Sequence, residues 1–109
     1  MKYKTIITEY PDYCIICGRP ATEGHHCPYG VANRKLAESD HLVFPLCSEH
    51  HRDGKMSAHR CHEVDVLLHI IAQEVWEKKY IIEKRGLPFD DIEEEARKAW
   101  IVRYGESWI

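Results

Sequence analysis

Cysteine and histidine, the side chains that most often bind transition metals, are confined to one stretch of this chain. All five Cys and all eight His fall between positions 14 and 69. Cys14 and Cys17 are separated by two residues and precede Gly18, which permits the tight turn that brings two sulfurs to one ion. Cys47 and His50 repeat this spacing. The four side chains predict a closed, tetrahedral Cys₃His site for a structural zinc ion.

The two remaining cysteines, Cys27 and Cys61, have no partner at ligand spacing. We expect them to be small buried side chains, although each stays open as an alternative member of the zinc site. A disulfide framework is not expected, because the interleaving of Cys with His is typical of a metal site in a reducing compartment.

Two pairs of adjacent histidines, His25-His26 and His50-His51, flank the rest of the cluster. Neighbouring residues of a strand point to opposite faces, and neighbours on a helix lie about 100° apart. Each pair is therefore expected to divide between two roles. One member of the first pair would bind metal while the other faces a water molecule, and one member of the second pair would bind zinc while the other points elsewhere.

The elements that must position these residues can be outlined from the sequence. We expect a strand at about 21–27, a turn at 28–30, a polar loop through 33–35, a second strand at 41–46 with Pro45 at its end, and a helix from 47 to about 53 that stops at Gly54. His59 could then reach the same metal as His51 only if the segment at 53–55 breaks the helix and turns the chain back.

Beyond this stretch, two amphipathic helices are predicted, over about 61–85 and from 90 to Gly105. Each helix has one apolar face at helical spacing. In the first helix this face consists of Val64, Leu67, Leu68, Ile71 and Val75. In the second it consists of Ile92, Ala96, Ala99, Trp100 and Tyr104. His69 falls within the first pattern and is expected to be a packed helix residue. His62, at the start of that helix, is expected to be similar and stays a reserve metal ligand.

The composition indicates one cytoplasmic domain of 109 residues. The longest apolar runs are far shorter than a membrane span, and the first residues lack a signal-peptide pattern. The net charge of −3 excludes a strongly basic nucleic-acid-binding protein by composition. The acidity is concentrated in residues 63–109, with seven Lys or Arg against eleven Asp or Glu, whereas residues 1–62 have eight against seven.

The order of two Cys, His25-His26, the segment Leu42-Val43-Phe44-Pro45-Leu46-Cys47 and His50-His51 resembles the HNH endonucleases, and most closely the small HNH proteins of phages and prophages. The resemblance covers residues 14–62 and, more loosely, the C-terminal helices. It implies an α+β fold, in which a small ββα-metal (treble-clef) core with a structural zinc at 14–62 is followed by two C-terminal helices at 63–109. It also implies a bacterial host cell as the location.

The resemblance further implies the roles of the histidines. His25 would be a ligand of a catalytic divalent metal and His26 the general base, while His51 would be the final histidine of the motif on the same metal and His59 an additional ligand. The Asn that usually stands five or six residues before the second Cys half-site is absent. Its place is held by His41 or Leu42, so His41 is the candidate for that role.

The implied activity is metal-dependent hydrolysis or nicking of DNA. It requires a base near neutral pH, which His supplies, and a cation, for which Mg²⁺, Mn²⁺, Ni²⁺ and Zn²⁺ stay open. Candidate DNA contacts are the basic residues that flank the site: Arg34, Lys35, Arg52 and Lys55. The resemblance also implies phage replication, recombination or packaging proteins as partners. The alternative is a non-catalytic zinc-binding module that contacts nucleic acid or protein, for example a packaging accessory.

Overall fold

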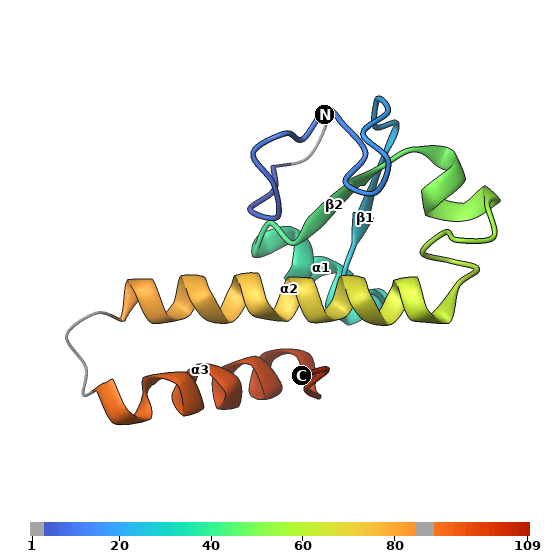
Figure 1. Cartoon of the computed structure of the whole chain (residues 1–109). Helices are drawn as coiled ribbons and strands as arrows, with labels where there is room; N and C mark the ends of the chain where they lie inside the picture. The colour runs from blue at the N-terminus through green and yellow to red at the C-terminus, as the bar shows by residue number, and fades with distance from the viewer. Residues whose placement is uncertain (1–3, 85–88) are drawn as a thin grey trace.

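The chain begins with a loop region and a small sheet and ends in two long helices, as the computed structural model shows (Figure 1). The structure describes residues 4–84 and 89–109. In chain order the elements are β1 (Glu23–His26), α1 (Val31–Ser39), β2 (Val43–Leu46), a π-helical turn η1 (Glu49–Asp53), α2 (His62–Glu83) and α3 (Phe89–Tyr104). The expected α+β class is confirmed.

The sheet has two antiparallel strands, β1 and β2. His25 pairs with Phe44 and His26 with Val43, while Pro45 pairs with Gly24. Pro45 therefore lies within β2, not at its end as the sequence suggested. A strand with only one hydrogen-bonded neighbour tolerates proline, because a donor on its free edge is not needed. Each of the four residues of β2 is buried, and β2 forms the centre of the core.

The segment between the two strands is the helix α1, so the polar loop predicted through 33–35 is wrong. Good helix formers such as Ala, Arg, Lys, Leu and Glu fill this segment. The helix is anchored on one side only, by the fully buried Ala37 and by Leu36, which packs against the core. Gly30 precedes the helix with a φ of +103°, a conformation that favours glycine.

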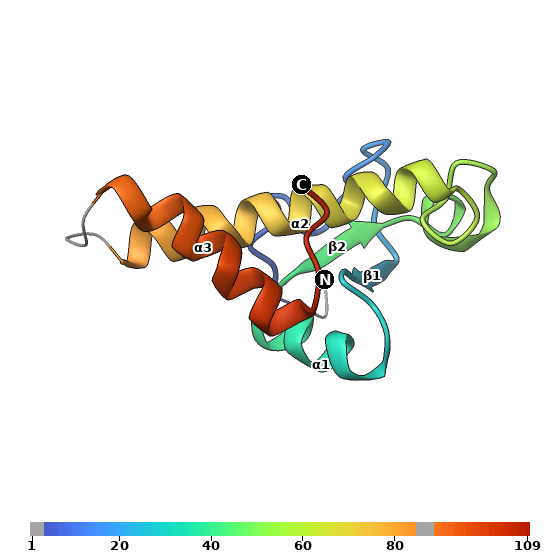
Figure 2. The same ribbon diagram turned by 90° about the horizontal axis from the view of Figure 1, so that it is seen from below.

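The two C-terminal helices lie side by side and run in opposite directions, as both views show (Figures 1 and 2). Their bounds are close to those predicted, although the predicted end of the first helix falls on residues outside the described part. The face predicted for α3 is confirmed at its buried positions: Ile92, Ala96, Trp100 and Tyr104. On α2, Leu68 is buried but Leu67 is exposed, so its predicted place on the buried face is wrong.

One hydrophobic cluster joins the sheet to the helices. Its members come from the cysteine region, from α1, from β2, from the segment after η1 and from both long helices: Cys14, Cys27, Ala37, Leu42, Phe44, Leu46, Cys47, Ala58, Leu68, Ala72, Trp100 and Tyr104. Two sulfurs of the predicted zinc site therefore belong to the same core that holds the long helices. Within the described part, no helix has the length and apolar character that a membrane crossing requires.

Candidate metal centres

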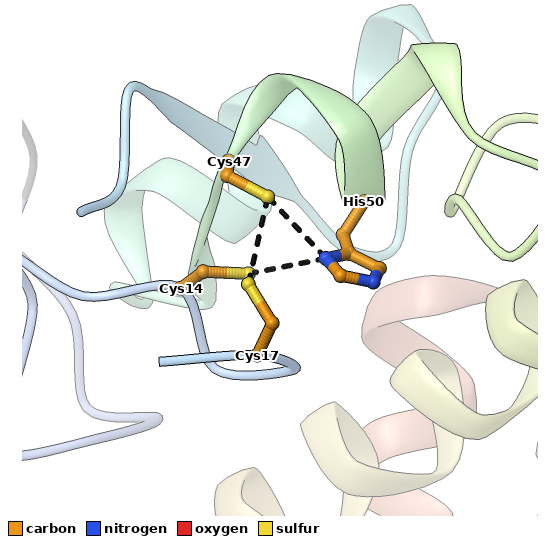
Figure 3. Close-up of side chains that lie close together, drawn as sticks. All are labelled: Cys14, Cys17, Cys47 and His50. Atoms are coloured by element: carbon orange, nitrogen blue, oxygen red, sulfur yellow. Dashed lines mark hydrogen bonds between the residues drawn. The ribbon is translucent and has the colours of Figure 1, made fainter. Parts of the chain in front are cut away.

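Four side chains from two distant segments converge on one point, as Figure 3 shows. The ligand atoms of Cys14, Cys17, Cys47 and His50 all lie within 4.8 Å of one another. Sγ of Cys17 is 3.7 Å from Sγ of Cys47, and Nδ1 of His50 is 3.3 Å from Sγ of Cys47 and 3.9 Å from Sγ of Cys14. A tetrahedral zinc ion would separate two sulfurs by about 3.8 Å and a sulfur from a nitrogen by about 3.5 Å. The cluster therefore has the dimensions of a metal site.

The first half of this cluster is a tight loop that contains Cys14 and Cys17. Its ends meet in a bridge between Tyr13 and Pro20, and the backbone N–H of Cys14 donates to the carbonyl of Arg19 over 2.7 Å. Gly18 has a φ of +77°, which confirms that this turn requires a glycine-like backbone.

The second half follows directly from the end of β2. Cys47 is the residue after this strand, and His50 lies three residues on, in η1. The backbone N–H of Ile15 donates to the carbonyl of Pro45 over 2.9 Å, which holds the cysteine loop against the strand. The two halves are thereby fixed by backbone contacts as well as by the four side chains.

The thiol of Cys14 is suited to metal binding. Its burial would raise its pKa, but hydrogen bonds from the backbone of Cys47, Cys17 and Ile16 outweigh this effect and lower the pKa to about 7. A lowered pKa favours the thiolate, which is the form that binds metal.

Neither Cys27 nor Cys61 belongs to a metal cluster of the described residues. Cys27 is fully buried, and burial raises the pKa of its thiol, as expected for a structural side chain. Cys61 is half-buried at the start of α2, where its thiol donates to the Glu63 carboxylate over 3.4 Å.

A second cluster consists of His25, His51 and His59, whose ligand atoms also lie within 4.8 Å of one another. Nε2 of His51 is 3.1 Å from Nε2 of His59. The His25 ring centroid is 5.1 Å from that of His51 and 5.2 Å from that of His59, with the rings edge to face. Three imidazoles from β1, from η1 and from the segment after it thus surround one point.

The side chains of this cluster fit a divalent cation. Nε2 of His25 is buried and has no hydrogen-bond partner among the described residues, and the His25 side chain is only 3% exposed. A tetrahedral ion with two nitrogen ligands would hold them about 3.3 Å apart, close to the separation of His51 and His59. Burial and the neighbouring His51 and His59 charges lower the pKa of His25 to about 3, which keeps its lone pair free.

The chain returns to His51 after η1, which brings His59 into the cluster. Helical structure ends at Asp53, and Gly54 is extended, with φ −83° and ψ 162°. The backbone N–H of His59 then donates to the carbonyl of His51 over 3.1 Å. A Cβ at Gly54 would lie 2.8 Å from the Glu49 carbonyl oxygen, so a glycine is needed for this close approach. The predicted condition for His59 is thereby met.

Sequence reasoning missed Glu23. Its Oε2 lies 2.9 Å from Nδ1 of His51, and both atoms are buried. A carboxylate behind a ligating histidine orients the ring and increases its basicity. The available signal was an acidic residue two positions before His25, on the same face of the strand.

A cleft of about 330 Å³ opens beside the histidine cluster. Its lining comes from β1, the following turn, the start of α1, η1 and the segment beyond: Gly24, His25, His26, Tyr29, Gly30, Val31, Arg34, His51, Arg52 and His59. Of the four basic residues predicted to contact DNA, Arg34 and Arg52 line this cleft, whereas Lys35 and Lys55 are exposed and lie outside the lining.

His26 and His25 have different neighbours, as strand alternation predicted. Burial, followed by the positive charge of Arg34, lowers the pKa of His26, while the Glu38 charge has the opposite effect. His26 is therefore neutral near pH 7 and able to accept a proton. It reaches the same cleft as the three clustered imidazoles.

Among the other histidines, His62 lines a neighbouring cavity together with His25 and His59. His41, with a φ of +60°, lines a separate cavity with Asp40 and Trp76, so the structure does not bring it to the cleft. His62 is exposed. His69 is buried and stacks on Trp108 at 4.4 Å, as a packed helix residue. Neither belongs to a metal cluster of the described residues.

Comparison of the chain with protein-family models, with curated proteins and with solved structures gives no match.

Proposed function

We propose that this protein is a metal-dependent endonuclease or nickase of the HNH type that hydrolyses DNA phosphodiester bonds. The observation that carries this proposal is the second cluster. A structural ion needs only the Cys₃His set, whereas His25, His51 and His59 converge separately, beside a cleft that also contains His26 and two arginines.

The proposal includes the treble-clef assignment. Zinc on the Cys₃His cluster would hold the cysteine loop to η1, and a ββα-metal core would be formed by β1, β2 and the segment that bears His50 and His51. The helix α1, inserted between the strands, and the α2–α3 pair would be additions to that core.

His26 would act as the general base. Its neutral imidazole would take a proton from a water molecule, whose oxygen forms a bond to phosphorus as the bond from phosphorus to the 3′ oxygen breaks. The 3′ oxygen leaves as a hydroxyl after it gains a proton from solvent, and the other product carries the 5′ phosphate. A divalent cation held by His25, His51 and His59 would supply positive charge for the phosphate and the departing oxygen.

The decisive experiment is a plasmid nicking assay with His26→Ala in added Mg²⁺, Mn²⁺, Ni²⁺ or Zn²⁺. Loss of a general base is expected to reduce the rate by about 10²–10⁴-fold. The control is Lys98→Ala, which truncates an exposed side chain on α3 outside both clusters and outside the lining of the cleft. Metal content and the thermal midpoint are expected to be the same for the two variants.

Two results would reject this function. Nicking at the wild-type rate by His26→Ala would show that His26 is not the general base. A wild-type protein that binds about one zinc per chain but cleaves DNA in none of the four metals would favour the non-catalytic zinc-binding module.

A further inference from the structure

The first turn of α1 presents backbone hydrogen-bond donors that the helix itself does not use. Gly30 precedes the helix and provides no side-chain cap, and the first helical bond runs from the N–H of Arg34 to the carbonyl of Gly30 over 2.7 Å. The N–H groups of Val31, Ala32 and Asn33 therefore have no partner within the helix. Aligned peptide dipoles add about half a positive charge at this end.

This helix end lines the cleft that contains the histidine cluster. Gly30, Val31 and Arg34 form part of its wall. The space beside Gly30 is open, because a Cβ built there would meet no atom within 4 Å. Val31 is 88% exposed, so the first residue of the helix is open to solvent.

An independent observation points to a bound cation in the same cleft. The His25 side chain, 3% exposed, lines it, and its Nε2 has no hydrogen-bond partner among the described residues. The cleft thus combines a candidate cation site, uncapped backbone donors and the guanidinium of Arg34. Within the described part of the chain, that guanidinium forms no ion pair with a carboxylate.

We propose that the first turn of α1 and Arg34 form a cradle for a phosphate oxyanion, namely the non-bridging oxygens of the phosphodiester that is hydrolysed in the cleft. The inference rests on the proposed nuclease function and deepens it, since it assigns the substrate phosphate to a helix that interrupts the two strands. Backbone N–H groups at a helix N-terminus bind phosphate through both hydrogen bonds and the dipole.

Val31→Pro tests the cradle at a single donor. Proline is tolerated at the first helical position, where its missing N–H is not needed by the helix. The ψ of 158° at Gly30 suits a residue that precedes proline. Val31→Ala is the matched control, because it also removes the exposed side chain but keeps the N–H.

The measurement is the binding of inorganic phosphate to the Mn²⁺-loaded full chain, followed by broadening of its ³¹P resonance. We expect Val31→Pro to bind phosphate roughly tenfold more weakly than Val31→Ala, as for loss of one hydrogen bond to a charged group. Equal affinities of these two variants, with equal helix content, would overturn the cradle.

A second pair of variants tests the cradle without proline, so a folding defect in Val31→Pro does not affect the result. Val31→Glu places a carboxylate at a helix N-terminus, where it stabilises the helix but repels phosphate, and Val31→Gln is its neutral control. Weaker phosphate binding by Val31→Glu than by Val31→Gln supports the cradle. Equal binding by this pair contradicts it.

A dinucleotide phosphodiester, dTpdT, separates the substrate group from free phosphate. Dependence of dTpdT binding on the Val31 N–H supports the assignment, whereas dependence of inorganic phosphate binding alone overturns it.

Failure of the cradle and failure of the nuclease remain distinct. If the wild type nicks DNA but phosphate affinity is equal within each of the two pairs of Val31 variants, only the cradle is rejected. Phosphate binding that depends on α1 without nicking rejects only the nuclease.

Discussion

At the scale of single residues, each pair of adjacent histidines divides between two environments. On β1, His25 contacts the other two clustered imidazoles, while the nearest charges to His26 come from α1. On η1, His50 joins the cysteines and His51 joins the second cluster. The cause in both pairs is the change of direction between consecutive side chains. Two metal sites can therefore share one short stretch of chain without sharing a ligand.

Glu23→Gln tests the carboxylate behind His51. The substitution keeps the size of the side chain but removes the charge that lies 2.9 Å from Nδ1 of His51. We expect affinity for Co²⁺ at the histidine cluster to fall about 10- to 100-fold. Metal titration followed by absorption would measure this, since thiolate bands report the cysteine site separately.

The control for this change is Glu94→Gln, which neutralises an exposed carboxylate paired with Lys98 on α3. It is expected to leave the metal affinities of the histidine cluster and of the cysteine site unaltered. Equal affinity of Glu23→Gln and the wild type at the histidine cluster would show that Glu23 does not support His51.

At the scale of elements, the short η1 turn and the segment after it connect the two sites. η1 begins two residues after Cys47 and contains both His50 and His51, and the chain then returns so that His59 hydrogen bonds to the backbone of His51. The return depends on the close approach of Gly54 to Glu49. The return of the chain thereby brings the third imidazole, that of His59, to the second cluster.

Gly54→Ala tests this element. Its Cβ would meet the Glu49 carbonyl oxygen at 2.8 Å, so either the turn or η1 has to shift. We expect a loss of about 1–3 kcal/mol in the free energy of unfolding, as for overpacking, and weaker metal binding at the histidine cluster. Urea unfolding and metal titration measure the two effects.

Lys55→Ala is the control, because this neighbouring side chain is exposed. A Gly54→Ala variant that matched Lys55→Ala in both stability and metal affinity would show that the return does not require glycine.

At the scale of the whole molecule, Asp40 joins α1 to the two long helices. Its carboxylate accepts hydrogen bonds from Nε1 of Trp76 over 3.0 Å, from Nε of Arg103 over 2.6 Å and from the hydroxyl of Tyr104. The hydrogen bond to Asp40 also raises the pKa of Arg103. The helix pair thus holds α1, and with it the start of α1 at the cleft.

Asp40→Asn is expected to lower the free energy of unfolding by about 2–3 kcal/mol. The substitution removes the negative charge that accepts hydrogen bonds from the half-buried Arg103. Urea denaturation provides the measurement, and Glu38→Gln, an exposed change on the same helix, is the control. Unfolding of both variants at the same urea concentration would show that Asp40 does not stabilise the contact between α1 and the long helices.

The Cys₃His cluster is also a property of the whole molecule, since Cys14 and Cys47 belong to the hydrophobic core. Metal binding at such a site contributes directly to folding. We expect Cys14→Ser, or removal of metal by a chelator, to lower the thermal midpoint by at least about 10 °C. Cys61→Ser is the control, as it changes a thiol outside both clusters. A Cys14→Ser midpoint equal to that of Cys61→Ser would exclude a stabilising metal at this site.

The sequence by itself determined the features that depend on near neighbours. The spacing of two residues between Cys14 and Cys17, and again between Cys47 and His50, predicted the four members of one metal cluster. Apolar residues at helical spacing predicted both long helices. These features are readable because strand alternation and helical rotation assign directions to side chains along a local segment.

Only the tertiary structure decided the contacts between residues far apart in the chain. The hydrogen bonds that Arg103 donates to Asp40 have no local signature. The acidic residue before His25 was visible in the sequence, but its partner, His51, was not. Gln73 shows why. This polar side chain is fully buried on α2, because it hydrogen bonds to Ser107 and to the backbone of Trp108, which the returning α3 brings near. Burial of a polar group is favourable only where such partners exist, and the folding back of the chain supplies them.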